Sequence, residues 1–256
     1  MIRLKSEEEI AVLRENALMV SKTLAEVGRH IEPGITTKEL DVIAEKYIRG
    51  LGAVPGFLGY EGFPATLCLS VNDVVVHGFP SAYKLKEGDI ISVDCGTIYR
   101  GYFGDSAYTF PVGKVDARTQ QLLDATKHAL ELGIRQAVAG NRTGDIGEAV
   151  QSYCENLGFS VVRELVGHGL GTDMHESPEV PNYGRRGHGV KLLEGMVICI
   201  EPMINAGRKE VYLDDNGWAV HTADGAKSAH FEKTVAVRHG QPEVLTTFEF
   251  IEKEIC

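Results

Sequence analysis

The segment VDCGTIYRGYFGD, residues 93–105, decides the expected fold of this chain. β-Branched and aromatic residues are dense on both sides of Arg100-Gly101, which is typical of two strands folded back on each other. A reversal centred near Tyr99 to Gly101 would place Asp94 opposite or nearly opposite Asp105. Directly opposed residues have Cβ atoms about 4.5–5.5 Å apart. Carboxylates at that separation repel each other, so the segment predicts a cation between them, with a divalent metal ion as the obvious candidate.

One pattern of residues occurs twice along the chain. The segment RHIEPGITTKEL at residues 29–40 matches RQAVAGNRTGDI at residues 135–146, and LKEGDIISVD at residues 85–94 matches LLEGMVICIE at residues 192–201. The second match pairs Asp94 with Glu201, so each half delivers a carboxylate at the same point of an equivalent strand. We therefore predict an internal pseudo-repeat, with units at about 7–116 and 117–250.

Each unit is expected to contain a helix, a glycine turn, a second helix and then strands. Apolar residues recur at helical spacing over 7–31 and 117–139, and Thr36 with Glu39 has the spacing of a capping box. Gly52 and Gly158 suit helix C-termini. Later strands are expected over 196–206, 209–214, 217–222 and 229–237. The pattern predicts an α+β fold in which two halves, related by pseudo-two-fold symmetry, form one curved, mainly antiparallel sheet with helices packed on one face.

Composition indicates a globular protein with a substantial core. The chain has 256 residues, of which 43% are hydrophobic and 24% charged. A net charge of −10 argues against a broad nucleic-acid-binding surface, and neither a membrane span nor a signal peptide is expected. The five scattered cysteines fit reduced thiols, mostly in the core, and a cytoplasmic location.

Three further residues complete a set of candidate metal ligands. His168 lies between two glycines, Glu201 ends the apolar run VICI, and Glu232 lies in the strand-like stretch AHFEKT. Taken singly, each has a simpler explanation as a turn, cap or loop residue. Together with Asp94 and Asp105 they make a mostly hard ligand set, suited to Mn, Fe, Co or Zn. Five such ligands are enough for two ions about 3.5–4 Å apart, as in two-metal hydrolases.

Seven motifs, in order along nearly the whole chain, resemble type I methionine aminopeptidases, which have the pita-bread fold. They are His77-Gly, Val-Asp94, Gly-Asp105, Gly-His168-Gly, His175, Ile-Glu201-Pro and Phe-Glu232-Lys-Thr. The short interval between the last two motifs and the start directly into a helix are similar to the compact bacterial kind. The resemblance implies that residues 1–256 form a single catalytic domain.

The resemblance implies a metal-dependent hydrolase that removes the initiator methionine from nascent proteins and prefers a small second residue. It implies two divalent ions of cobalt, manganese, iron or zinc, with a water between them as the nucleophile. Asp94 would hold one ion, Asp105 and Glu232 would bridge the pair, and His168 with Glu201 would complete the other. The free α-amine of the substrate would reach the ion held by Asp94.

Further roles follow from the same resemblance. Glu201 would also move a proton, while His77 and His175 would orient the substrate and stabilise the tetrahedral intermediate. The methionine side chain would lie against aromatic rings and sulfur, which suit a thioether. This pocket is expected to be lined by Tyr60, Phe63, Cys68 and Trp218, with Phe57 and Met174 as further candidates. We interpret the remaining histidines as surface or structural residues: His30, His128, His188, His221, His230 and His239.

Two other functions stay open. One is an Xaa-Pro aminopeptidase or prolidase on the same fold, although such enzymes usually carry an additional N-terminal domain. The other is a non-catalytic peptide-binding protein, although relatives of that kind lose metal ligands. The resemblance also implies peptides and nascent chains as partners, with transient association with the ribosome. We expect a monomer, with no binding to DNA or membranes.

Overall fold

Strands β4 (Ile90–Tyr99) and β5 (Tyr102–Pro111) form an antiparallel hairpin in the computed structural model, which describes residues 2–255. The turn is Arg100-Gly101, and both residues have left-handed φ angles, 50° and 80°, as in a two-residue type I′ turn. Asp94 therefore pairs with Ala107, and Asp105 pairs with Gly96. The two carboxylates are diagonal neighbours on one face, because the reversal lies slightly nearer the C-terminus than a directly opposed pair requires.

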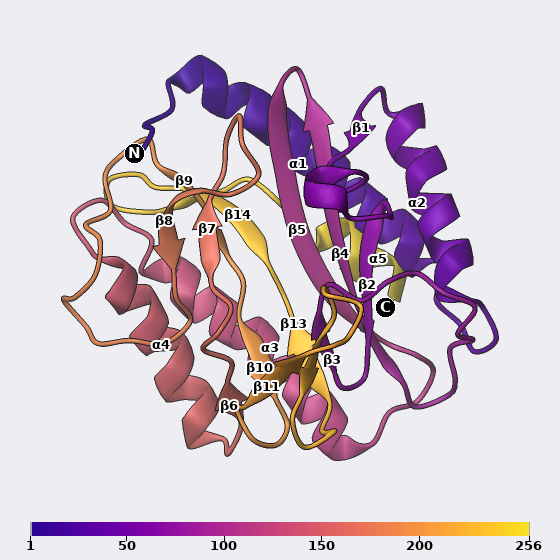
Figure 1. The fold of residues 1–256 in the computed structure, drawn as a ribbon. Helices are drawn as coiled ribbons and strands as arrows, with labels where there is room; N and C mark the ends of the chain where they lie inside the picture. Colours follow the sequence, from indigo (N-terminus) through magenta and orange to yellow (C-terminus); the bar gives the residue numbers. More distant parts are fainter. Residues whose placement is uncertain (1, 256) are drawn as a thin grey trace.

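The strands of the described chain form four hydrogen-bonded sheets, and all pairings between named strands are antiparallel (Figure 1). The hairpin sheet also contains β1 (Val54–Pro55) and β2 (Leu67–Val71). A five-stranded sheet contains β7 (Gly167–Gly169), β8 (Glu176–Val180), β9 (Val197–Ile200), β14 (Lys233–Ala236) and β15 (Glu243–Val244). One three-stranded sheet contains β6 (Ser160–Val161), β10 (Met203–Asn205) and β13 (Ser228–His230). The other contains β3 (Val74–Val76), β11 (Val211–Leu213) and β12 (Val220–Thr222).

Helices and strands alternate in blocks, which confirms the α+β prediction. The helices are α1 (Glu7–Gly28), α2 (Thr37–Gly50), α3 (Ala117–Arg135), α4 (Thr143–Asn156) and α5 (Glu249–Ile255), with one 3-10 turn at Tyr60–Gly62. The first and third helices end a few residues before the predicted limits. A capping box at Thr36 and Glu39 begins α2 as predicted, and a second, at Ser6 and Glu9, begins α1. In Figure 1, α1 and α3 run behind the strands; α1 packs against β4 and β5, and α3 against β9, β10 and β13.

The two halves make the same local contacts at matching positions. Gly34 and Gly140 both have φ of 103°, and their amides donate to the carbonyls of Leu85 and Leu192 at 2.7 and 2.9 Å. The next turns of chain also match, since the amides of Thr37 and Thr143 donate to the carbonyls of Tyr83 and Val190. In each half, these hydrogen bonds join the start of the second helix to the segment that precedes a strand with a candidate ligand on it or directly after it.

Two predicted strands are interrupted at the glutamates proposed as ligands. The expected strand 196–206 divides into β9 and β10 at Glu201-Pro202, and 229–237 divides into β13 and β14 at Phe231-Glu232. The registers Ile200↔Lys233 and Met203↔His230 place the two breaks beside each other. Proline has no N–H for a ladder, and here two paired strands pass together from one sheet to another. Because the strands break at these positions, the side chains of both glutamates need not alternate between the two faces of a sheet.

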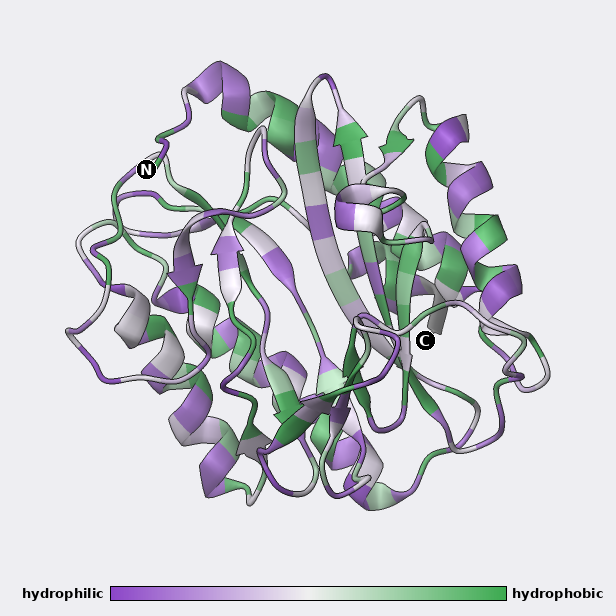
Figure 2. Cartoon of the chain, viewed as in Figure 1, coloured by the Kyte–Doolittle hydropathy of each residue, from purple (hydrophilic) through white to green (hydrophobic). Residues whose placement is uncertain are grey.

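Hydrophobic residues gather on the central strands, whereas hydrophilic segments recur on α2 and α4 (Figure 2). The largest apolar cluster joins buried residues of both halves, among them Leu24, Ile91, Ile146 and Ile200. Burial of this shared core holds the halves together. Within residues 2–255, we find no helix with the length and apolar character that a bilayer span requires.

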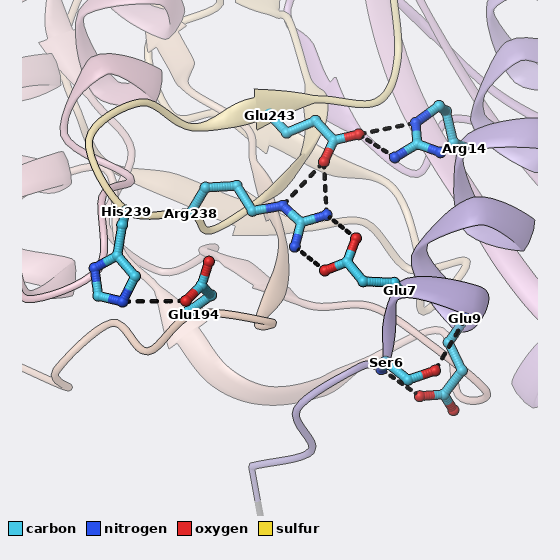
Figure 3. A network of polar contacts seen from close by, with 8 residues as sticks. All are labelled: Ser6, Glu7, Glu9, Arg14, Glu194, Arg238, His239 and Glu243. Atoms are coloured by element: carbon cyan, nitrogen blue, oxygen red, sulfur yellow. Dashed lines mark hydrogen bonds and ion pairs between the residues drawn. The ribbon is translucent and has the colours of Figure 1, made fainter.

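The start of α1 is tied to the chain that follows β14. Figure 3 shows Arg238 between Glu7 and Glu243, with Arg14 on the other side of Glu243. The Arg238 guanidinium donates to both carboxylates, at 2.8 Å to Glu7 Oε2 and 2.8–3.0 Å to Glu243 Oε2. The Arg238 side chain is only 18% exposed, whereas that of Glu7 is 72% exposed, so the network reaches the surface where it joins the start of α1 to the segment after β14.

Candidate active site

A cavity of about 220 Å3 lies among the strands of the four sheets, and every residue in the predicted site lines it. These residues are Tyr60, Phe63, Cys68, His77, Asp94, Asp105, His168, His175, Glu201, Trp218 and Glu232. Some are more than a hundred positions apart in sequence. The cavity therefore exists only in the folded chain.

Five elements deliver the candidate ligands. Asp94 lies on β4, Asp105 on β5 and His168 on β7, while Glu201 directly follows β9 and Glu232 directly precedes β14. The imidazole Nε2 of His168 lies 3.6 Å from Asp105 Oδ2 and 3.6 Å from Glu201 Oε1. These separations exceed a hydrogen bond and leave room for a cation in contact with all three groups.

The His168 ring is oriented with Nε2 toward the carboxyl groups. Its Nδ1 lies 2.9 Å from the carbonyl oxygen of Gly169, an acceptor, so Nδ1 carries the hydrogen and Nε2 keeps its lone pair. Side chains at the flanking positions would collide with backbone: a Cβ would lie 2.3 Å from the Cys199 oxygen at Gly167 and 2.5 Å from the Ser177 oxygen at Gly169. The Gly-His-Gly sequence is therefore needed to place β7 between β8 and β9.

The buried carboxyl groups lack counter-charges. Asp94 Oδ1, Asp105 Oδ1 and Glu232 Oε1 have no hydrogen-bond partner in the described chain. No lysine or arginine occurs among the described residues that line the cavity. Buried polar groups are normally satisfied, and buried charges are paired or coordinate metals. Because these oxygens are the ligands that divalent cations accept, the residues present fit a bound metal.

Burial and mutual repulsion change the pKa values of this group. Burial, with further repulsion from Glu201, raises the pKa of Asp94 to about 7, and burial raises that of Glu201 to about 8. Burial and the neighbouring carboxylates also raise the pKa values of Asp105 and Glu232 well above their usual range. Burial and the nearby His175 lower the pKa of His168 to about 4. Without a cation the site thus retains protons on carboxyl groups, which a metal ion would displace.

Cys199 lies beside the proposed ligands, although we expected a mostly hard set of donors. One donor atom from each of Asp105, His168, Cys199 and Glu232 lies within 4.8 Å of the others. The Cys199 thiol lies 3.6 Å from the Thr234 hydroxyl, and burial, together with the nearby Glu232 carboxylate, raises the pKa of the thiol well above the usual range. We therefore interpret Cys199 as a neutral thiol behind a carboxylate ligand.

His77 and His175 flank the carboxyl groups without joining them. His77 has a left-handed φ of 59°, and burial lowers its pKa to about 4. A non-glycine residue in this region is strained, and such residues gather at functional sites. His175 Nδ1 lies 2.9 Å from the Tyr60 hydroxyl, and the His175 and His168 rings are 4.5 Å apart. With Tyr60 donating to Nδ1, the Nε2–H of His175 is left as a donor.

An apolar wall closes one side of the cavity. Phe63 packs edge-on against Trp218 with ring centroids 5.2 Å apart, and Cys68 pairs directly with Asp94 across β2 and β4. Phe57 also lines the cavity, as expected. Met174 is buried in the same apolar cluster but is not among the lining residues, so it supports this wall from behind.

Two polar residues of the cavity lining were not predicted from the sequence. His230, interpreted above as surface or structural, is a buried residue of the cavity wall, and its Nε2 lies 3.6 Å from Glu201 Oε2. The signal was present, because His230 precedes Glu232 by two positions in a strand-like stretch. Glu61, an exposed residue with φ of 48°, also lines the cavity. Burial lowers the pKa of His175, and the charge of Glu61 offsets part of that shift. The remaining residues of the cavity lining are apolar: Val76, Leu165, Val166 and Met203.

The part of the chain that resembles known proteins includes every residue of the site. A model described as metallopeptidase family M24 matches residues 11–239. Methionine aminopeptidase of Clostridium perfringens is 50% identical over 246 residues, 96% of this chain and 99% of that protein. The crystal structure of methionine aminopeptidase from Rickettsia prowazekii has a TM-score of 0.95 at 39% identity and covers 96% of this chain and 100% of that chain. Prolidase from Pyrococcus furiosus, with a TM-score of 0.76 at 21% identity, shares the fold over 66% of its length.

Proposed function

This chain belongs to metallopeptidase family M24, and from that premise we propose that it is a methionine aminopeptidase. It hydrolyses the peptide bond after an N-terminal methionine and prefers a small second residue. The observation that carries the proposal is the convergence of four carboxyl groups, those of Asp105 and Glu232 buried and those of Asp94 and Glu201 partly buried, and one imidazole on a cavity that has aromatic rings and a thiol on another wall. The expected pita-bread fold is confirmed by the solved relatives.

Two divalent ions are the proposed cofactors, drawn from cobalt, manganese, iron or zinc. Asp94 would help to hold one ion and His168 with Glu201 the other, while Asp105 and Glu232 would contribute to holding both. The unpartnered oxygens of three of these carboxyl groups support this assignment. When bound, such ions lower the pKa of a water molecule toward neutrality and polarise a carbonyl group.

Glu201 and the two histidines supply the other chemical groups. Glu201, whose pKa is raised to about 8 in the metal-free site, is suited to accept a proton from the attacking water and pass it to the leaving amine. His77 and His175 have lowered pKa values, so at neutral pH they are neutral and present N–H donors. Such donors stabilise negative charge that develops on the substrate carbonyl oxygen.

Selectivity for methionine is assigned to the apolar wall. Phe63, Trp218 and Cys68 offer rings and sulfur against which an unbranched thioether packs well. Tyr60 fixes His175 beside this wall. The α-amine of the substrate would lie near Asp94, directly across the strand pair from Cys68, so only an N-terminal residue fits.

The remaining expectations are also proposals. We infer that the chain acts as one monomeric catalytic domain on peptides and nascent chains, with transient contact with the ribosome. An Xaa-Pro aminopeptidase or prolidase activity is not favoured, because the similarity to prolidases is at the level of fold. A purely peptide-binding role is opposed by the presence of all five candidate ligands and both histidines.

The test compares peptide hydrolysis by purified protein supplied with Mn²⁺ or Co²⁺. We expect release of methionine from Met-Ala-Ser and little hydrolysis of Ala-Ala-Ser or Ala-Pro peptides. The variant Asp94→Asn should lose metal and activity, whereas Asp124→Asn, an exposed change on α3, should keep both. Faster cleavage of the proline peptide, or full activity of Asp94→Asn, would contradict the proposal.

A further inference from the structure

His230 is a buried imidazole without hydrogen-bond partners in the described chain. Its side chain is 2% exposed, and both ring nitrogens expose less than 1 Å2. A buried polar group without a partner destabilises the folded state. We therefore expect His230 to gain a hydrogen-bond partner when the site is occupied.

The backbone holds His230 rigidly. It ends β13, where it pairs with Met203 of β10. Its amide donates to Thr109 Oγ1 at 2.9 Å, and that hydroxyl donates to the His230 carbonyl at 2.7 Å. A side chain on a strand fixed from both sides can hold another group in one orientation.

The neighbour that His230 faces is Glu201. His230 Nε2 lies 3.6 Å from Glu201 Oε2, and His168 Nε2 lies 3.6 Å from Glu201 Oε1. Each oxygen of this carboxyl group is therefore directed at a different imidazole. We propose that His230 is a positioning residue for Glu201, with its Nε2–H donating to Oε2 so that Oε1 stays directed at His168 and the metal position. The proposal rests on the metal-dependent function proposed above.

The geometry favours this role over direct contact with substrate or metal. Both nitrogens of His230 are shielded, so a peptide in the cavity has no access to them. Hydrogen bonds of this kind measure about 2.7–3.2 Å, so a small rotation of the carboxyl group closes the gap. Bonds at such sites are often long without ligands and shorten when the site is loaded. An ionised Glu201 can only accept, which fixes the hydrogen on His230 Nε2.

Two substitutions of equal length separate positioning from packing. His230→Gln keeps an amide N–H near the place of the imidazole Nε2, whereas His230→Met fills the same space without a donor. Each is made in the wild type and in Glu201→Gln. Calorimetric titration of metal-free protein with Mn²⁺ gives the affinity, kinetics with Met-Ala-Ser give kcat and KM, and thermal unfolding gives Tm. His221→Met, on β12 and outside the cavity lining, is the matched control.

Loss of a group that orients a metal ligand typically costs about 10–100-fold in affinity or activity. We expect His230→Met to weaken Mn²⁺ binding by about that factor and to lower kcat with little change in KM. His230→Gln and His221→Met should stay within about threefold of wild type. In Glu201→Gln the further effect of His230→Met should disappear, because the pair acts as one unit. The Tm of metal-free His230→Met should not fall, since two unpartnered buried nitrogens are removed.

Two kinds of result would overturn the proposal. One is unchanged Mn²⁺ affinity and kcat in His230→Met, or an equal loss in both backgrounds. The other is a lower Tm or failure of His230→Met to fold, which would identify a structural histidine. The titrations do not depend on turnover. If the wild type binds Mn²⁺ but releases no methionine, the proposed function fails while the His230–Glu201 coupling is still measured.

Discussion

Removal of metal should make the stability of this protein fall as pH rises through neutrality. Burial raises the pKa of Asp94 to about 7 and that of Glu201 to about 8 in the folded chain. In the unfolded chain both groups are ionised above about pH 5. The folded state then binds more protons than the unfolded state, so the free energy of unfolding decreases with increasing pH. Burial lowers the pKa values of His77 and His168, so both are neutral in the folded chain. In the unfolded chain they titrate near pH 6.5, so their contribution has the opposite sign and is largely complete by about pH 7.5.

The contributions of Asp94 and Glu201 can be worked out from their raised values. Between about pH 6.5 and about pH 8.5, proton linkage gives a loss of about 1 kcal/mol for Asp94 and about 2 kcal/mol for Glu201. Asp105 and Glu232, whose pKa values are also raised, add to this loss. For a chain of this length, about 3 kcal/mol corresponds to a fall in Tm of about 6–12 °C. Bound metal replaces the protons and stabilises the folded state, so saturation with Mn²⁺ should remove the fall.

Differential scanning calorimetry of chelator-treated protein over this pH range provides the measurement. Glu201→Gln should reduce the pH dependence, because it removes one of the groups that bind a proton in the folded state and weakens the repulsion on Asp94, Asp105 and Glu232. Asp124→Asn, on the exposed side of α3, should keep the wild-type slope. A metal-free Tm that stays level or rises with pH would refute the reasoning, as would an unchanged slope in Glu201→Gln.

Three other changes have defined outcomes. His77→Ala should lower kcat by about 100-fold, as expected for a donor to the carbonyl oxygen, in assays with Met-Ala-Ser; full activity would exclude that role. Glu61→Gln should abolish a preference of about two- to fivefold for Met-Ala-Lys over Met-Ala-Glu, because Glu61 is the exposed acid of the cavity; the preference should also weaken in salt. Asn16→Ala should cost about 1–3 kcal/mol in urea unfolding, since buried Asn16 bonds the Thr97 hydroxyl and the Tyr102 carbonyl; no loss would mean that these groups find other partners.

Much of the framework could be predicted from local patterns. The hairpin around Arg100-Gly101, the capping box at Thr36 and the helices of both units each depend on residues close in sequence. The candidate site could be predicted because its carboxylates lie in motifs at fixed order and because the repeat pairs Asp94 with Glu201. All eleven residues of that prediction line one cavity.

The errors have physical causes in tertiary structure. The mostly apolar character of 196–206 hides the break at Glu201-Pro202, although the proline was a signal that the strand could not continue. The register of the hairpin depends on which two residues form the turn, and one residue of displacement moves Asp94 from Asp105 to Ala107. The spacing of His230 from Glu232 is a local signal, but the burial of His230 beside Glu201 depends on the pairing of β10 with β13, which lies outside its local sequence.

The proposed ligands are divided between the two units of the chain. Asp94 and Asp105 belong to the first unit, and His168, Glu201 and Glu232 belong to the second. Ions held by both sets would act as a removable cross-link between segments far apart in sequence, comparable in principle to a disulfide that closes a long loop. Two separately expressed halves should then reassemble more readily with metal than without it. Chelation would favour their separation, so metal supply would control the integrity of the molecule as well as its chemistry.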